Sequence, residues 1–123
     1  MIWRDEEHLW GYLKPRMRGK WWRLEASCPD GLTDSMGLWQ GQTHWLEHKI
    51  GRPSVQLLRP AQRTFALECR DHGVPWYACF GYRGNAWFYD FNGLLTNTAV
   101  TPPFWVSPSE ALRLPREKAV GEA

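Results

Sequence analysis

With 123 residues and a net charge of +2, from 15 Lys and Arg against 13 Asp and Glu, the chain is long enough for a single domain and leaves any nucleic-acid surface to local clustering of basic residues. Its three cysteines are widely spaced without a Cys-x-x-Cys pair, which argues against a disulfide framework or a structural zinc site and for a reducing compartment. It has neither an apolar run of about 20 residues nor a secretion signal, so we expect a cytoplasmic protein without membrane contact.

The first expected element is a helix from about Trp3 to Lys14. Its apolar residues recur near helical spacing, and Pro15 ends it, because the residue before a proline is pushed out of the α region. Acidic residues fill the first turn, at positions 5–7, where the helix dipole favours negative charge. A solvated helix start explains these acidic residues without further function.

A cluster of basic residues follows this helix. It consists of Lys14, Arg16, Arg18 and Lys20, with Trp21 next to it. Clustered Lys and Arg can contact phosphates while a neighbouring ring stacks on bases, so the segment is a candidate nucleic-acid-binding surface. An ordinary solvated linker is an equally good interpretation.

Two stretches with strand character come next. Residues 22–28 predict a strand with Glu25 in its middle, and Cys28-Pro29-Asp30-Gly31 is a turn sequence. The stretch from Asp34 to Lys49 then predicts two short strands folded back at Gln40-Gly41. This hairpin would carry Asp34 back towards the far end of its second strand.

The end of that second strand holds the residues with the clearest chemistry. Since side chains alternate between the faces of a strand, Glu47 and Lys49 share one face while His48 points to the other. Two carboxylates, Asp34 and Glu47, next to an ammonium group are suited to hold a divalent cation and activate a water. We therefore expect a metal site here. His44 and His48 lie on the opposite face, which offers no acids or cysteines for a zinc site.

The second half of the chain predicts one long helix, two strands and one short helix. Gln62 lies in the first turn of the long helix. The expected elements are a helix from Pro60 to about His72 ended by Gly73, strands over 75–82 and 86–91 joined at 83–85, and a short helix starting in the capping box of 107–110. We expect one domain over residues 1–118 and a frayed tail over 119–123.

Four short motifs occur along the chain: Arg23-Leu24-Glu25, Gly31-Leu32-Thr33-Asp34, Trp45-Leu46-Glu47-His48-Lys49 and Pro60-Ala61-Gln62. Their order and spacing resemble the PD-(D/E)XK nuclease superfamily, and within it the small VRR-NUC and Holliday-junction-resolvase-like proteins of phages and bacteria. The resemblance spans roughly residues 21 to 92. It departs from the family at Thr33, where proline is usual, and Pro29-Asp30 offers a rival placement of the Pro-Asp pair.

The resemblance implies a fold and an activity. The expected fold is α/β (α+β) and restriction-endonuclease-like, with a central mixed sheet of four to five strands flanked by helices. The expected activity is a Mg²⁺-dependent DNA endonuclease, with Mn²⁺ as a substitute, selective for junctions, flaps or nicks and found in a bacterial or phage-infected cell. DNA is thus the expected partner, and a two-fold junction would call for a homodimer.

The resemblance also assigns roles to single residues. Asp34, Glu47 and the main-chain carbonyl of His48 would bind the metal, while Lys49 would act on the nucleophile and Gln62 would orient Lys49 or the phosphate. Further metal ligands would come from Glu25 and from a glutamate of the first helix, Glu6 or Glu7.

Other functions remain to be weighed. The chain has no Gly-x-Ser-x-Gly, no phosphate-binding glycine loop and no dinucleotide fingerprint, so no nucleotide cofactor is expected. The main alternative is a catalytically inactive nucleic-acid- or protein-binding module on the same scaffold, in which Thr33 marks a lost active site. A third is a structural or inhibitory phage protein whose Glu47 and Lys49 form only a surface ion pair.

Overall fold

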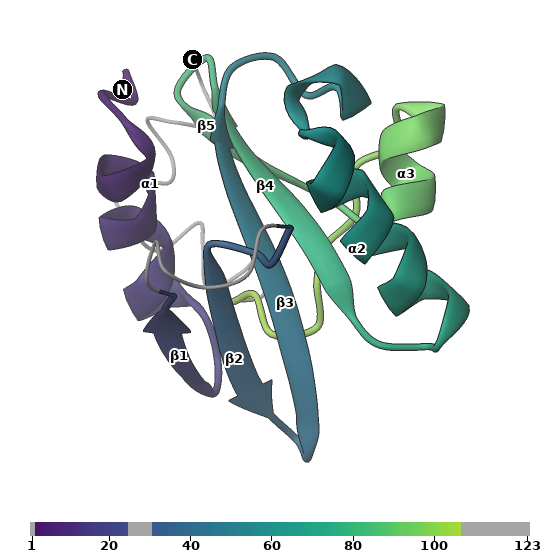
Figure 1. Ribbon diagram of the computed structural model, residues 1–123. Helices are drawn as coiled ribbons and strands as arrows, with labels where there is room; N and C mark the ends of the chain where they lie inside the picture. The colour runs from purple at the N-terminus through teal and green to yellow at the C-terminus, as the bar shows by residue number, and fades with distance from the viewer. Residues whose placement is uncertain (1, 25–30, 107–123) are drawn as a thin grey trace.

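The computed structural model describes residues 2–24 and 31–106 (Figure 1). In chain order its elements are α1 (Glu6–Leu13), the 3₁₀ turn η1 (Lys14–Arg16), β1 (Lys20–Arg23), β2 (Ser35–Trp39), β3 (Gln42–Ile50), the 3₁₀ turn η2 (Val55–Leu57), α2 (Pro60–Asp71), β4 (Trp76–Tyr82), β5 (Asn85–Tyr89) and α3 (Phe91–Thr96). No helix in the described ranges is long and apolar enough to cross a membrane.

The five strands form one mixed sheet in the order β1-β2-β3-β4-β5. Neighbouring strands are antiparallel except β3 and β4, which run parallel because α2 carries the chain back between them. The expectation of an α+β fold with a mixed sheet of four or five strands is confirmed, and the Glu47 strand lies at its centre.

Two tight hairpins set the register of the antiparallel strands. Gln40 and Gly41 have φ of 52° and 75°, and Arg83 and Gly84 have φ of 51° and 75°. Two consecutive residues with positive φ are typical of the two-residue hairpin loop that matches the twist of its strands. Both turns lie where the sequence predicts them, so the β2–β3 register that places the candidate site follows from local chemistry.

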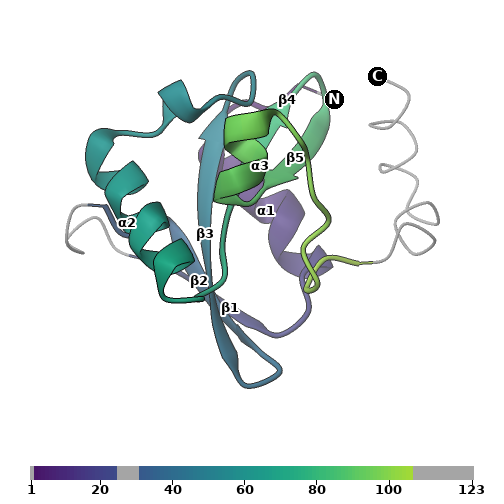
Figure 2. The ribbon, with the colours of Figure 1, turned by 90° about the vertical axis from the view of Figure 1, so that its right-hand side faces the viewer.

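Helices pack on both faces of the sheet (Figure 2). The layer on one side of the sheet is built on α1, with Leu9 and Leu13 in its core, and the layer on the other is built on α2 and α3. Phe104 completes the α1 side: its fully buried ring lies at centroid distances of 4.7 Å from Trp21 and 6.2 Å from Phe88, which belong to opposite edge strands. The segment after α3 is therefore part of the core.

Several boundaries differ from the expectations. The α1 helix begins at Glu6, because the Asp5 side chain accepts a hydrogen bond from the His8 amide and caps it, so the expected start at Trp3 is wrong. The first strand starts at Lys20, and residues 25–28 of the expected strand lie outside the described part of the chain. The α3 helix was not expected. The capping box at 107–110 and the tail at 119–123 also lie outside the described residues.

Candidate active site

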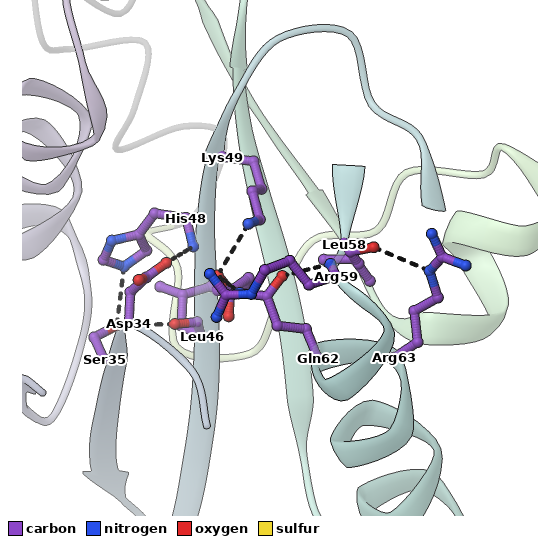
Figure 3. A network of polar contacts seen from close by, with 10 residues as sticks. Asp34, Ser35, Leu46, His48, Lys49, Leu58, Arg59, Gln62 and Arg63 are labelled. Carbon is purple, nitrogen blue, oxygen red and sulfur yellow. Dashed lines mark hydrogen bonds and ion pairs between the residues drawn. The ribbon is translucent and has the colours of Figure 1, made fainter. Parts of the chain in front are cut away.

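The β2–β3 hairpin places Asp34 beside the end of β3. Ser35 is paired with Leu46, and one residue earlier the Asp34 carboxylate oxygen Oδ2 accepts a hydrogen bond of 2.8 Å from the His48 amide (Figure 3). Thr33 stands where the nucleases that the sequence resembles usually have proline; it is buried, and its hydroxyl donates a hydrogen bond of 2.7 Å to the Ser35 carbonyl. This bond ties down the backbone just before Asp34, so the turn is held by a hydrogen bond where a proline would restrict φ.

Glu47 is a buried carboxylate on the face of β3 that looks towards α2. Only 1% of the residue is exposed. Its Oε2 accepts a 2.9 Å hydrogen bond from Gln62 Nε2 and lies 3.6 Å from Lys49 Nζ. Its Oε1 is buried and accepts no hydrogen bond from a donor among the described residues. Ionising Glu47 would leave this oxygen charged and without a donor, which is costly in a protein interior, and a bound cation would remove that cost.

Gln62 connects this carboxylate to the start of α2. Its Oε1 accepts a hydrogen bond of 2.8 Å from the Arg59 amide, while its Nε2 donates to Glu47, so both ends of the amide are used. Because Pro60 opens the helix, Gln62 stands at its third position, where a side chain can reach back to cap the helix. One buried side chain thus caps α2 and orients Glu47.

The electrostatics of the site disfavour a second negative charge. The pKa of Glu47 is raised to about 9, chiefly by burial; the hydrogen bond with the Asp34 carboxyl and the charge of that group also raise this pKa, and Lys49 lowers it by less. Although Lys49 is 3.6 Å away, burial outweighs this ion pair, because the carboxyl is almost wholly withdrawn from water. Without a cation, Glu47 is therefore protonated at neutral pH and can donate its proton to Asp34.

Of the two candidate glutamates on α1, the structure brings Glu6 towards the site. Partial burial raises the pKa of Glu6, and the next largest influence is the carboxylate of Asp34. Glu7 is exposed and lines a shallow groove on the outer side of α1 with Arg4 and His8. A second groove is lined by both Glu6 and Glu7 together with Arg23, so each glutamate stays a predicted ligand, and Glu6 is the one on which the Asp34 charge acts. Glu25, the other expected ligand, lies outside the described residues.

The histidines of β3 lie on the opposite face, as the alternation predicts. His48 is buried, stacks on Trp10 at 5.0 Å and lies 2.9 Å from the Ser35 hydroxyl through Nε2. Burial lowers its pKa to about 4, so the ring is neutral. His44 packs against Phe104 instead. The hydrogen bonds of these rings go to Ser35 and to the Trp39 carbonyl and not to the carboxylates, although the Asp34 charge acts on the His48 ring. No group of three or more His, Cys, Asp or Glu suited to a metal is found within residues 2–24 and 31–106.

The basic segment after α1 has a largely structural role. Arg16 donates to the Tyr12 carbonyl at 2.7 Å, and Arg18 donates to the Trp105 carbonyl at 2.6 Å. Trp21 is only 4% exposed and packs in the α1-side core, so the expectation that its ring stacks on nucleic acid is corrected. Lys14 and Lys20 are exposed and remain candidates for phosphate contacts.

Two arginines that the sequence did not single out surround the site. Arg23, at the end of β1, and Arg59, just before α2, both lower the pKa of Glu6, which places their charges near it. The Arg59 side chain extends from the start of α2 back towards β3 (Figure 3). In the sequence only their positions could have pointed to them: Arg23 belongs to the Arg-Leu-Glu motif, and Arg59 precedes the proline of the Pro-x-Gln motif.

Comparison with known proteins adds no family to this description. No protein-family model matches the chain, and neither a curated protein nor a solved structure is significantly similar to it. A functional assignment therefore depends on the residues that the fold brings together.

Proposed function

We propose that the protein is a Mg²⁺-dependent endonuclease that hydrolyses phosphodiester bonds in DNA, with selectivity for DNA structure over sequence. The observation that carries this proposal is the convergence of Asp34, Glu47, Lys49 and Gln62 at one point, from two strands and the start of a helix. These four residues are up to 28 positions apart in the sequence, and the fold brings their side chains together. Their order also agrees with the PD-(D/E)XK resemblance.

The donor set fits a hard divalent cation. Mg²⁺ prefers carboxylate and carbonyl oxygens, and the site offers Asp34 and Glu47, whose buried Oε1 accepts no hydrogen bond from a described donor. The His48 amide donates to Asp34, and in a strand the carbonyl of the same residue points to the same side, so the His48 carbonyl is the main-chain candidate. When bound, such an ion lowers the pKa of a coordinated water and offsets charge that develops on the phosphate; Mn²⁺ can replace it.

The other residues of the site have separate tasks in this proposal. Lys49 keeps its ammonium 3.6 Å from Glu47, where it can neutralise charge on a phosphate held between them. Gln62 holds Glu47 in one orientation, which keeps the carboxylate aimed at the metal position. Arg23 and Arg59 add positive charge around the carboxylates and would attract the DNA backbone.

The test compares cleavage and metal binding in matched variants. The wild type should cut flapped, nicked or branched DNA only with Mg²⁺ or Mn²⁺, and Glu47→Ala and Lys49→Ala should each lose cleavage by a factor of about 100 or more. Calorimetry should detect Mg²⁺ binding by the wild type and by Lys49→Ala and none by Glu47→Ala. Glu68→Ala removes an exposed glutamate of α2 and serves as the matched control.

Two results would overturn this function. One is a wild type that binds no divalent cation even with DNA present. The other is full cleavage by Glu47→Ala at the level of Glu68→Ala, which would assign the activity to a different site or to a contaminant. If DNA binding persists in the first case, the inactive binding module becomes the better description.

A further inference from the structure

The sheet has an open area next to the candidate site, on the same face as Glu47. The strand registers align three rows of side chains on this face, from the hairpin end inwards: Lys20, Leu38 and Thr43; then Trp22, Met36 and Trp45; then Asp34 and Glu47. Rows are two residues apart, about 7 Å along the strands. The second row is therefore next to the carboxylates, and the first row lies one row further out.

The α2 helix covers only part of this face. Trp45 packs edge-on against Phe65 of α2 at 5.3 Å, which identifies the face as the α2 side of the sheet. Trp22 and Leu38, on β1 and β2, are 41% and 47% exposed. In Figure 1, β1 and β2 lie well to the side of α2. An indole and an aliphatic side chain thus face solvent within two rows of Glu47.

The charge around this area favours a polyanion. The two outer rows contain no acidic residue, and the Lys20 ammonium lies 5.7 Å from the centre of the Trp22 ring. At the inner end Lys49 and Arg59 add further positive charge. A second copy of the chain would bring these like charges together across an interface, whereas a nucleic-acid strand would neutralise them.

We propose that this open face binds an unpaired nucleotide next to the scissile phosphate, with the base stacked on Trp22 and a phosphate near Lys20. The backbones of β1 and β3 are two strand spacings apart, about 10 Å, so a short stretch of single strand spans the distance from Trp22 to Glu47. Aromatic side chains bind single-stranded nucleic acid in this way, with little dependence on sequence.

This inference rests on the proposed function and narrows its substrate class. In an intact duplex every base is paired and stacked, so none can lie on Trp22. A flap, a gap or an unpaired branch offers a free base beside a phosphodiester bond. The expected substrates are therefore flapped, gapped or single-stranded nucleic acids, and intact duplex is the poor one.

The experiment measures binding without catalysis, using fluorescently labelled flap, single-stranded and duplex DNA in EDTA. Trp22→Ala should bind flap and single-stranded DNA about 10- to 100-fold more weakly than the wild type and leave the weak duplex binding unchanged. Trp22→Phe keeps a ring and should retain most of the affinity. The matched control is Trp87→Ala, which removes another partly exposed indole (38%) on β5, at the opposite edge of the sheet.

The outcomes separate this inference from the function on which it rests. If Trp22→Ala binds flap DNA as the wild type does, or loses duplex and flap binding equally, Trp22 is not a base platform, even where Mg²⁺-dependent cleavage is intact. If the wild type does not cleave DNA but Trp22→Ala weakens binding as expected, the nuclease proposal is wrong and the binding face is supported. If sedimentation gives Trp22→Ala half the molecular mass of the wild type, the face is a dimer contact and the proposal is overturned.

Discussion

Replacing Glu47 with Gln should stabilise the metal-free protein. Burial raises the pKa of Glu47 to about 9 from an ordinary value of 4.5, so at neutral pH the folded state must hold a proton that the unfolded chain releases. At pH 7 the gap of about 2.5 pH units above 4.5 corresponds to about 3 kcal/mol at 1.36 kcal/mol per unit. This free energy opposes folding of the wild type and is absent in Glu47→Gln.

The sign follows from the direction of the shift. A carboxyl with a raised pKa in the folded state contributes its full stability below pH 4.5 and loses it as the pH rises towards 9. Gln can still accept the hydrogen bond from Gln62 with the oxygen that replaces Oε2, but the amide group that replaces the buried Oε1 is not fully hydrogen-bonded, which costs about 1 kcal/mol. A net gain of about 2 kcal/mol near pH 7 to 8 should raise the melting temperature by roughly 10 °C.

The assay is thermal unfolding in EDTA from pH 4 to pH 9, with Glu68→Gln as a control on the surface of α2. The melting temperatures of wild type and Glu47→Gln should be equal at about pH 5, with the wild type higher below this pH and Glu47→Gln increasingly higher above it. Added Mg²⁺ should then raise the melting temperature of the wild type and not that of Glu47→Gln, since only an ionised carboxylate binds the ion. Equal pH dependence in the two proteins, or a less stable Glu47→Gln at pH 8, would refute the reasoning.

Two further predictions concern the fold and the site. Gly37→Ala should unfold the protein or destabilise it by about 3 kcal/mol in urea titrations, because a Cβ at this position would overlap the Trp21 ring; an unchanged midpoint would mean that β1 does not pack as described. Gln62→Ala should cost about 2 kcal/mol by the same measurement and lower metal affinity about tenfold, since it removes the cap of α2 and the partner of Glu47. Normal metal affinity in that variant would show that Glu47 needs no support.

Much of the central hairpin could be read from the sequence because its determinants are local. Gln40-Gly41 has the chemistry of a two-residue turn, and a strand period of two then assigns Glu47 and His48 to opposite faces without any long-range information. The position of Gln62 beside Glu47 was different. Only the resemblance suggested it, because the geometry depends on how α2 crosses the sheet.

The errors arose where distant contacts decide the role of a residue. The sequence Lys-Trp-Trp-Arg has no polar alternation, so nothing local tells which of Trp21 and Trp22 faces the core; Gly37 on the neighbouring strand decides it by making room for Trp21. Arg18 looked like part of a phosphate-binding cluster, but it binds the carbonyl of Trp105, 87 positions away. The α3 helix is only six residues long, too short for a periodic pattern to show.

The buried ring of Phe104 also has a consequence for biosynthesis. A chain that is still being made has β1 to β5 complete before this residue is added, yet the α1-side core lacks the ring that lies against Trp21, His44, Tyr77 and Phe88. Domains fold as units during synthesis, and here the last core residue comes from near the end of the described chain. The α1-side core of the nascent protein is therefore incomplete until this phenylalanine has been added and has emerged from the ribosome.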